Sequence, residues 1–473
     1  MAFAHEIFLA LAALVLFGLT LASPRSGTAR RTALVLSVLG VVTAALALGA
    51  RGELFYGTYR VDAFSQWLKL MVAVGFFAVV ALGEGLRGVQ GEYEPEYYFF
   101  LSLSVLGLTF LMSGVELLTL FIALELSSFA LYVLVPLRRS EQTVHVEAGI
   151  KYVLFGALAS GVSLFGMSYV FGLAKTTHLD ELLVVFPELV GSPLGIVALT
   201  LMLGGFFFKL ALFPFHFWTP DVYQGAANET AGVIATLPKI GAVAVLIRLT
   251  GLGGTEPGGF FLVLVLLAVL SMTYGNLAAL VQTDLKRLLA FSSISHAGFM
   301  MTGILSGTIQ GYAGAMFYVG GYLLMNLALF YVIYSLAPAG ENVSLGHLRG
   351  LHRRAPLLAF TLAVAAFGLA GIPPTMGFMG KFYVLAAALD RGYLALVIIA
   401  ALNTAIGVFY YLKMVRAAFS PEEEGEEPAP EARVPLTLLG RGLGYAFCLA
   451  ILLFGVLPGA VLSLFVEALA WAG

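Results

Sequence analysis

The segment from Phe206 to Tyr223 reads FFFKLALFPFHFWTPDVY, and a second segment, from Phe367 to Leu385, reads FGLAGIPPTMGFMGKFYVL. Both are apolar enough for the core of a lipid bilayer, yet each contains one lysine and two prolines. Proline inside a membrane helix frees backbone carbonyls, and these are tolerated only where they face protein or a water-filled cavity. The two segments therefore predict a membrane protein with two broken helices that line a polar interior.

The composition of the whole chain agrees with a membrane protein. Its 473 residues are 60% hydrophobic and 11% charged, with a mean hydropathy of +0.96, which leaves too little polar surface for a water-soluble globule. The single cysteine, Cys448, excludes a disulfide within the chain and a four-thiolate iron–sulfur cluster. No Gly-rich phosphate loop is present, so no recognisable motif binds NADH or ATP on this chain. We also expect no metal site and no nucleic-acid partner.

Apolar runs between charged or Gly/Pro-rich breaks predict an all-α fold of about 14 transmembrane helices, because about 20 apolar residues cross about 30 Å of hydrocarbon. We interpret Ile7 to Leu21 as the first of them, since no basic residue precedes it as in a signal peptide. One membrane domain, 1–473, is expected, with acidic Ser420 to Glu431 as a solvated loop. The expected spans are 5–22, 32–49, 63–83, 96–112, 116–135, 147–173, 193–222, 229–250, 259–281, 287–306, 312–336, 356–389, 393–419 and 436–470.

The distribution of Lys and Arg predicts the orientation of these helices. With the N-terminus outside, fifteen of the 25 basic residues, including Arg25 and Arg433, fall at inward loops or helix ends, and five fall at outward ones. Cytoplasmic loops collect Lys and Arg, so this bias favours that orientation. One missed helix would reverse the alternation downstream, so the bias also supports the helix count.

The five remaining basic residues lie inside apolar spans: Lys69, Lys151, Lys209, Lys239 and Lys381. A charge at mid-bilayer costs about 2.5 to 3.5 kcal/mol even on the insertion scale, so such residues usually face the bundle interior and carry ion traffic. Lys69 lies about two turns from a helix end, and we expect it to snorkel. Lys151 follows Glu147 by one turn and leaves both interpretations open. A functional role is predicted for the other three.

An acidic residue, Glu125, lies in the middle of the apolar run LLTLFIALELSSFALYVLV, from Leu117 to Val135. A carboxylate alone in such a place would take up a proton, whereas a neighbouring lysine would hold it ionised. Such mutual control of protonation is what a proton relay needs. A purely structural ion pair between two helices stays open as the alternative.

The two broken segments lie five helices apart. Broken helices in corresponding positions of two halves are typical of inverted-repeat transporters, whose ion site lies at the breaks. We therefore expect two inverted five-helix repeats, approximately 96–250 and 259–419. The correspondence is approximate, because Lys209 precedes the prolines of its segment and Lys381 follows those of its own. Kinks that serve packing alone are the alternative.

The string KLALFPFHFWTPDVYQGA, Lys209 to Ala226, resembles the seventh-helix signature of the antiporter-like subunits of bacterial NADH-quinone oxidoreductase (respiratory complex I), of the subunit N type related to mitochondrial subunit 2. Supporting matches at 147–161, 276–299 and 371–384 extend the resemblance over almost the whole chain. WTPDVYQG is the specific part, because subunits L and M and Mrp-type subunits typically read W-L-P-D-A there. One departure concerns the start of the eighth helix, where Ala227 to Thr230 replace the family's usual Pro-Thr-Pro.

The resemblance implies a proton-translocating subunit that couples quinone reduction elsewhere in the complex to proton transfer along a Glu/Lys axis. Glu125 and Lys209 would form a switchable pair, with a proton passing on to other lysines when the pair is broken. The implied proton path consists of Glu125, Lys209, Lys239 and Lys381. The implied supporting residues are His216, His296 and Lys151.

The resemblance also implies a multi-pass location in the bacterial inner membrane, with subunit M and subunit K or its neighbour as partners. The chain would be a non-redox subunit of the translocase, with NADH, FMN, iron–sulfur clusters and quinone bound on other chains. Two alternatives stay open. A stand-alone cation/proton antiporter would use the same residues without redox coupling, and a solute permease would have a ligand-sized cavity at the midplane.

Overall fold

The computed structural model describes residues 2–22, 27–83, 85–139, 143–251, 259–421 and 434–470. Arg25, Arg433 and residues 422–431 of the acidic segment lie outside the described residues. The α-helices are α1 (Ala4–Ala22), α2 (Thr28–Leu46), α3 (Ala63–Leu82), α4 (Glu94–Ser113), α5 (Leu117–Leu134), α6 (Val144–Ala174), α7 (Leu179–Gly191), α8 (Pro193–Met202), α9 (Gly204–Leu210), α10 (Thr219–Gly225), α11 (Asn228–Gly251), α12 (Gly259–Leu280), α13 (Leu285–Leu305), α14 (Ile309–Leu336), α15 (Leu351–Arg354), α16 (Pro356–Ala370), α17 (Met376–Asp390), α18 (Leu394–Phe419), α19 (Leu438–Val456) and α20 (Pro458–Ala470). Short 3-10 helices are η1 (Ala47–Gly49), η2 (Gly91–Tyr93), η3 (Val135–Leu137) and η4 (Gly346–Leu348), and two strands, β1 (Gly52–Leu54) and β2 (Tyr59–Val61), pair antiparallel.

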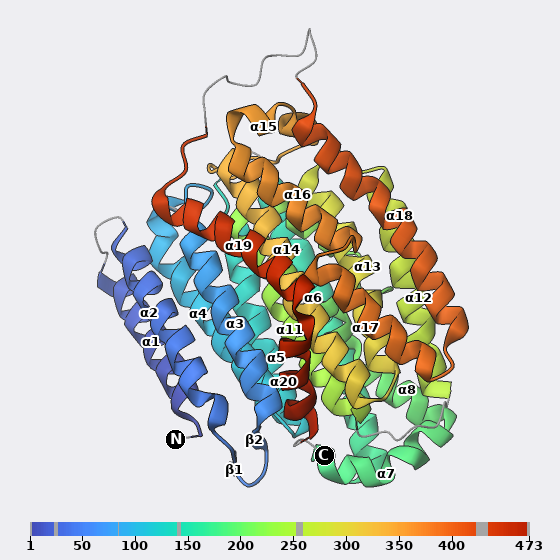
Figure 1. Cartoon of the computed structure of the whole chain (residues 1–473). Helices are drawn as coiled ribbons and strands as arrows, with labels where there is room; N and C mark the ends of the chain where they lie inside the picture. The colour runs from blue at the N-terminus through green and yellow to red at the C-terminus, as the bar shows by residue number, and fades with distance from the viewer. Residues whose placement is uncertain are drawn as a thin grey trace.

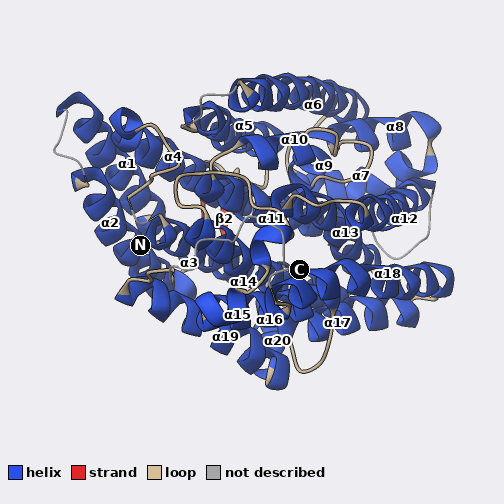
Figure 2. Cartoon of the chain, turned by 90° about the horizontal axis from the view of Figure 1, so that it is seen from above, coloured by secondary structure: helices blue, strands red, loops and turns tan. Residues whose placement is uncertain are grey.

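The long helices lie side by side and run between two opposite ends of the molecule, where the connections gather (Figure 1). Seen from above, α11, α13 and α14 lie inside the bundle and the other long helices surround them (Figure 2). The most apolar windows of α11 and α13 are 100% buried, and that of α14 is 94% buried. A helix that is apolar all round belongs in such a core, so these three form the centre of the protein.

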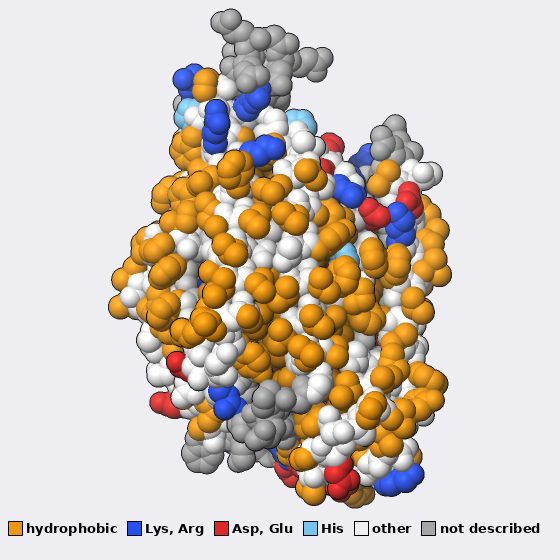
Figure 3. Space-filling view, turned by 90° about the vertical axis from the view of Figure 1, so that its right-hand side faces the viewer, with side chains coloured by type: hydrophobic (Ala, Val, Ile, Leu, Met, Phe, Trp, Pro, Cys, Tyr) orange, Lys and Arg blue, Asp and Glu red, His pale blue; other side chains and the backbone are white. Residues whose placement is uncertain are grey.

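The surface has the pattern of a protein that crosses a bilayer. Apolar side chains cover the middle of the molecule, and charged side chains gather at its two ends (Figure 3). Helix α15, with its two arginines, lies at one end, and the β1–β2 hairpin and α7 lie at the other (Figure 1). Following the distribution of Lys and Arg, we call the end that carries α15 the inner end.

Twelve described helices are long and apolar enough to cross a membrane, or thirteen when α8 and α9, bent by 45°, count as one span. By this measure the expected fourteen are not reached, because the expected span 356–389 consists of two fifteen-residue helices, α16 and α17. The expected span 193–222 is likewise divided into α8, α9 and α10. The prediction of an all-α membrane fold is confirmed, and so are the two broken segments.

Helix α7, at the outer end, lies between two expected spans and was not predicted. Its buried residues, Leu179, Leu182, Phe186 and Leu189, recur at helical spacing, so it is amphipathic, and thirteen residues are too few to span. An isolated bridge between Glu116 and His178 joins its start to that of α5. A similar bridge joins Asp284, at the start of α13, to Ser344. Each bridge ties the start of a long helix to a loop that lies far along the chain.

A buried ion pair fixes the outer end of α3. Asp62 caps this helix by accepting from the backbone N–H of Ser65 at 2.8 Å, and Arg248 of α11 donates to both of its carboxylate oxygens at 3.0 and 3.1 Å. Burial alone would raise the pKa of Asp62, but the Arg248 guanidinium and the hydrogen bonds from Ser65 hold that pKa below its ordinary value. The interaction joins α3 to the central helix α11.

The expectation that Lys69 snorkels is wrong. Its side chain is fully buried, with the amine 2.5 Å from a carboxylate oxygen of Glu6 in α1 and 3.3 Å from the hydroxyl of Tyr59. Tyr59 donates to the same Glu6 oxygen at 2.7 Å. A lysine snorkels only when water is its best available partner, and Glu6 provides a closer one. The pair therefore ties α1 to α3 inside the bundle.

We predict that Lys69→Met destabilises the protein by roughly 3 to 5 kcal/mol, because it leaves the Glu6 carboxylate buried without its counter-charge. The double variant Glu6→Gln with Lys69→Met should be more stable than Lys69→Met alone, since no charge is then stranded. Thermal unfolding in detergent measures both effects. The control is Arg60→Met. The Arg60 guanidinium pairs with the exposed carboxylates of Glu53 and Asp180, and each of these exposed pairs should contribute about 1 kcal/mol or less. Equal unfolding temperatures for the single and double variants would contradict the pairing.

Candidate functional site

The first broken segment ends helix α9 in the interior of the bundle. Ala211 adopts a left-handed conformation with φ 63°, and its N–H and that of Leu212 turn back to the carbonyls of Phe208 and Phe207 at 3.1 and 2.9 Å. Pro214 follows across a cis peptide bond and has no N–H with which to continue the helix. The chain becomes helical again only at Thr219. The last carbonyls of α9 are thereby left without helical partners.

The second broken segment ends helix α16 in the same way. Gly371 is left-handed with φ 83°, and the N–H groups of Gly371 and Ile372 turn back to the carbonyls of Gly368 and Phe367, both at 2.9 Å. Pro374 follows across a cis peptide bond. Position by position, Gly371 corresponds to Ala211 and Pro374 to Pro214. The two breaks therefore share one local geometry.

A lysine amine caps the free carbonyls at each break. Lys239, from α11, donates to the carbonyl of Leu210 at 2.5 Å. Lys381, from α17, donates to the carbonyls of Leu369 and Ala370 at 3.0 and 3.1 Å. Both amines lie above aromatic rings, Lys239 at 5.8 Å from Tyr322 and Lys381 at 4.8 Å from Phe299. The lysine that caps the first break, as Lys381 caps the second, is therefore Lys239. The sequence had suggested Lys209 as the counterpart of Lys381.

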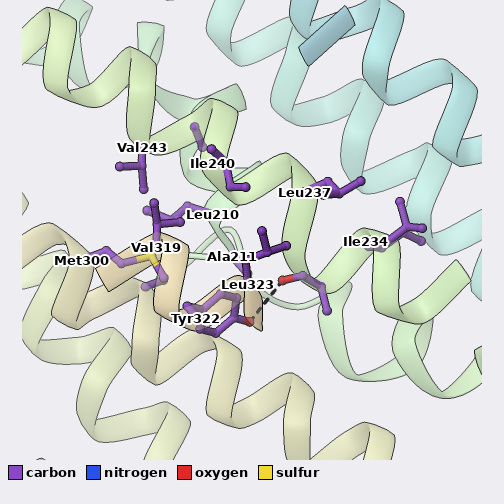
Figure 4. Close-up of a cluster of buried hydrophobic side chains, with 14 of the residues drawn as sticks. Leu210, Ala211, Ile234, Leu237, Ile240, Val243, Met300, Val319, Tyr322 and Leu323 are labelled. Atoms are coloured by element: carbon purple, nitrogen blue, oxygen red, sulfur yellow. Dashed lines mark hydrogen bonds between the residues drawn. The ribbon is translucent and has the colours of Figure 1, made fainter. Parts of the chain in front are cut away.

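Lys239 lies in an apolar shell. Leu210 and Ala211, at the end of α9, and Ile240 and Val243, of α11, belong to one cluster of buried hydrophobic side chains (Figure 4). The Tyr322 hydroxyl donates to the carbonyl of Ala235 at 3.1 Å, three residues before the Pro238 inside α11. Apolar surroundings strengthen each hydrogen bond of the ammonium and make its charge expensive to hold without them.

Lys209 lies in the last turn of α9 and is 2% exposed. Its amine lies 5.7 Å from the ring centres of both Tyr132 and Tyr152, and it has no hydrogen-bond partner among the described residues. The rings attract the cation through their faces. Of the three lysines at the breaks, Lys209 is the one held only by aromatic rings and by charge at a distance.

Glu125 does not contact Lys209 directly. The described residues show no ion pair within 4.0 Å between them. The Ser160 hydroxyl of α6 donates to the carboxylate at 2.5 Å, and the rings of Tyr132 and Tyr152 flank the amine. Glu125 nevertheless acts electrostatically on the Lys209 ammonium. The predicted contacting pair is therefore replaced by two separated charges, with Tyr132 and Tyr152 beside the amine.

His296 lies between the two capped breaks. One ring nitrogen is 2.6 Å from the Tyr318 hydroxyl and the other is 2.9 Å from the Tyr411 hydroxyl, which also bonds to Ser292. Both Lys239 and Lys381 act electrostatically on this ring. A histidine with hydroxyls on both nitrogens is suited to passing a proton from one side of its ring to the other.

The other two supporting residues lie elsewhere. His216 lies among the rings of Phe213, Phe217 and Tyr274, and neither ring nitrogen has a hydrogen-bond partner among the described residues. Lys151 is 35% exposed and forms ion pairs with Glu147 at 2.7 Å and Asp221 at 2.6 Å. The structure therefore does not bring either of them to the lysines at the breaks.

Sequence reasoning missed several polar residues near these lysines. Tyr132, Tyr152, Tyr318, Tyr322 and Tyr411 are all at most 5% exposed, and single tyrosines in apolar helices give no distinctive pattern. Asp221, which also pairs with Arg287 at 2.8 Å, lies inside the quoted WTPDVYQG string and could have been found there. Among the described residues, no group of three or more His, Cys, Asp or Glu side chains could hold a metal ion.

A membrane bundle with lysine amines buried at paired helix breaks defines an ion-translocating protein of the antiporter-like class. Residues 114–407 match the family described as NADH:quinone oxidoreductase/Mrp antiporter, TM. The curated NADH-quinone oxidoreductase subunit N 2 of Opitutus terrae is 48% identical over 471 residues, covering 99% of this chain and 97% of that one. This chain belongs to that family, and within it to the subunit N type.

Two solved structures extend the comparison. A chain in respiratory complex I from Thermus thermophilus with bound aureothin is 34% identical, with a TM-score of 0.83, over 97% of this chain and 98% of that one. The Mrp complex from Dietzia sp. contains a chain with a TM-score of 0.86 at 20% identity, over 99% and 97% of the two chains. At that identity the second likeness shows the fold alone.

Gly371 provides a test of the second break. A Cβ there would lie 3.0 Å from Cδ of Lys381, in addition to the strain of a side chain at positive φ. Gly392 has a similar φ, 80°, with nothing within 4 Å of an added Cβ. We predict that Gly371→Ala and Gly392→Ala share a cost of about 1 to 2 kcal/mol from the backbone. Only Gly371→Ala should also displace the Lys381 amine and lower ion transport in vesicles. Equal transport in the two variants would contradict this.

Proposed function

We propose that this chain is the proton-translocating subunit N of a bacterial NADH-quinone oxidoreductase, embedded in the inner membrane. The observation that carries the proposal is the pair of helix breaks, each with a buried lysine amine on its free carbonyls. A structural group capping these carbonyls would need only to donate hydrogen bonds. Lysine also titrates, so each cap can take up and release a proton.

The proposed path runs through Glu125, Lys209, Lys239 and Lys381. Movement or neutralisation of Glu125 would remove the charge that favours the Lys209 ammonium, so its proton would pass on toward Lys239. His296 and its two tyrosine hydroxyls lie in reach of both remaining lysines and would carry the proton to Lys381. Lys381 borders a cavity of about 530 Å³ between α17 and α18 that also reaches Asp390 near the outer end, which suits a terminal exchange group.

The two breaks support the proposal of two inverted repeats, approximately 96–250 and 259–419. Their matched hydrogen bonds and the matched bridges at Glu116 and Asp284 recur in each half. His216 and Lys151 would serve the path indirectly, Lys151 by holding Asp221 in the first turn of α10. With one cysteine, the chain itself would carry no redox chemistry.

The electron-transfer cofactors, NADH, FMN, iron–sulfur clusters and quinone, would be bound by other chains of the complex. Subunit M and subunit K or its neighbour are the proposed membrane-arm partners. Purification in mild detergent tests this assembly. Soluble NADH-oxidising subunits should co-purify with the chain, whereas an isolated assembly of antiporter subunits would favour the stand-alone cation/proton antiporter.

We predict that Lys239→Met and Lys381→Met each lower proton translocation by about tenfold or more per assembled complex, because each removes a titratable group from the path. Proton uptake by inverted vesicles, divided by the abundance of the complex, measures the effect. The matched control is Lys413→Met, whose side chain is exposed in α18. Translocation by both buried-lysine variants at the level of the control would refute the proposed path.

Glu125→Gln tests the separated charge. The amide oxygen can still accept from Ser160, so we expect assembly close to that of the parent protein. Proton translocation should fall, because no charge then acts on Lys209 from this position. A matched control is Glu188→Gln, exposed on α7. A normal ratio of protons to electrons in Glu125→Gln would remove Glu125 from the path.

A further inference from the structure

Glu229 is a buried acid that the proposed path does not use. It lies in the first turn of α11, within the residues that replace Pro-Thr-Pro, and is 4% exposed. Neither carboxylate oxygen has a hydrogen-bond partner among the described residues. Burying a carboxylate without partners is costly, so its presence at this point requires an explanation.

Two glycines keep the space around this carboxylate open. A Cβ on Gly88 would lie 3.2 Å from Oε2 of Glu229, and a Cβ on Gly83 would lie 3.8 Å from its Cγ. Gly88 also lies against the backbone of Gly340, beyond the end of α14. The carboxylate therefore points into the junction between the α3–α4 connection and the end of α14.

The same two segments line a cavity of about 360 Å³ at the inner end. Leu82 and Arg87 contribute to it from the α3–α4 connection, and Tyr334 and Pro338 contribute from the end of α14. Gly83 follows the lining residue Leu82 in sequence, and Gly340 lies two residues after the lining residue Pro338. Glu229 does not itself line this cavity, but the cavity adjoins the two segments against which the Glu229 carboxylate lies.

Positive charges surround Glu229 without pairing with it. Arg138 and Lys286 both act on the carboxylate electrostatically. Their own hydrogen bonds go to backbone carbonyls, those of Arg138 to Gln224 and Gly225 and that of Lys286 to Ala226 at 2.8 Å. Burial disfavours the charged carboxylate more strongly than these two cations favour it, and both carboxylate oxygens are free to accept a proton.

Glu229 and Lys239 lie along one face of α11, with the polar residue Thr236 between them in sequence. Glu229, Thr236 and Lys239 occupy positions i, i+7 and i+10, which lie on one face of α11. Ten residues of helix span about 15 Å. This face packs on α14, since a Cβ on Gly232 would meet Phe330 and the Tyr322 hydroxyl bonds to α11. Asn326 lies between those two positions of α14, with its Oδ1 unpartnered among the described residues.

We propose that Glu229 is the inner-side proton acceptor that loads Lys239, an inference that rests on the proposed function. The carboxylate takes a proton from water of the inner cavity. Its O–H bond then breaks as an N–H bond forms on the neutral Lys239 amine, with Thr236, Asn326, Tyr322 and water between them. Glu229 returns to the carboxylate, and Lys239 becomes the ammonium that caps Leu210.

The test compares Glu229→Gln with Glu341→Gln in inverted vesicles that contain the whole complex. Glu341 is an exposed carboxylate near the same end and also acts on Arg138. Glu229→Gln should lower proton uptake about tenfold per assembled complex, and Glu341→Gln should leave it unchanged. Uptake by Glu229→Gln equal to that of the control would overturn the inference.

Two further measurements separate this inference from the proposed function. Lys239→Met should be defective in both cases, so a defective Lys239→Met beside a normal Glu229→Gln would overturn only the role of Glu229. In the unmodified complex, a water-soluble carbodiimide should label Glu229 from the inner face and not from the outer face, as read by peptide mass spectrometry. If Glu229→Gln does not assemble, Glu229→Asp replaces it and should still pump protons. Absence of labelling from the inner face in the unmodified complex would overturn the inference.

Discussion

A backbone carbonyl released inside the bilayer has no water with which to bond, and each such group costs several kcal/mol unless the protein provides a donor. Two helices of this protein end in the interior, at Leu210 and Ala370, and a lysine amine is the donor at each end. The lysine amines therefore stabilise the free carbonyls, and the carbonyls in turn stabilise the buried ammonium groups, because burying an ammonium without hydrogen-bond partners also costs free energy. Most of the interior is arranged around this mutual requirement.

The requirement explains the helices at the centre. Lys239 comes from α11 and approaches the end of α9, while His296 and Tyr322 come from α13 and α14 and lie beside the capped ends. These three helices are the ones almost wholly buried, so their positions are fixed by contacts on all sides. Rigid surroundings keep the amines within reach of their carbonyls, and a change of protonation then has a direct structural consequence.

The charged side chains that form ion pairs differ in kind from those that have no charged partner. Asp62 with Arg248, Glu6 with Lys69, and Asp221 with Lys151 and Arg287 are ion pairs that join neighbouring helices. Glu125, Lys209 and Glu229, by contrast, have no oppositely charged partner within 4.0 Å among the described residues. A paired charge stabilises one arrangement, whereas an unpaired one responds to the protonation of its neighbours. This difference separates the residues proposed to hold the fold from those proposed to move protons.

The sequence by itself determined the membrane class, the position of most helices and the two breaks, because apolar runs of about 20 residues and prolines within them are local signals. It also singled out Lys209, Lys239 and Lys381 as unusual. Only the tertiary structure decided which groups meet. Lys69 forms an ion pair with Glu6 of α1, and Glu125 accepts a hydrogen bond from Ser160 and does not contact Lys209. Lys239 caps the carbonyl at the first break, as Lys381 does at the second. These partners are separated by 29 to 63 residues along the chain, and no local pattern specifies which faces of such distant helices come together.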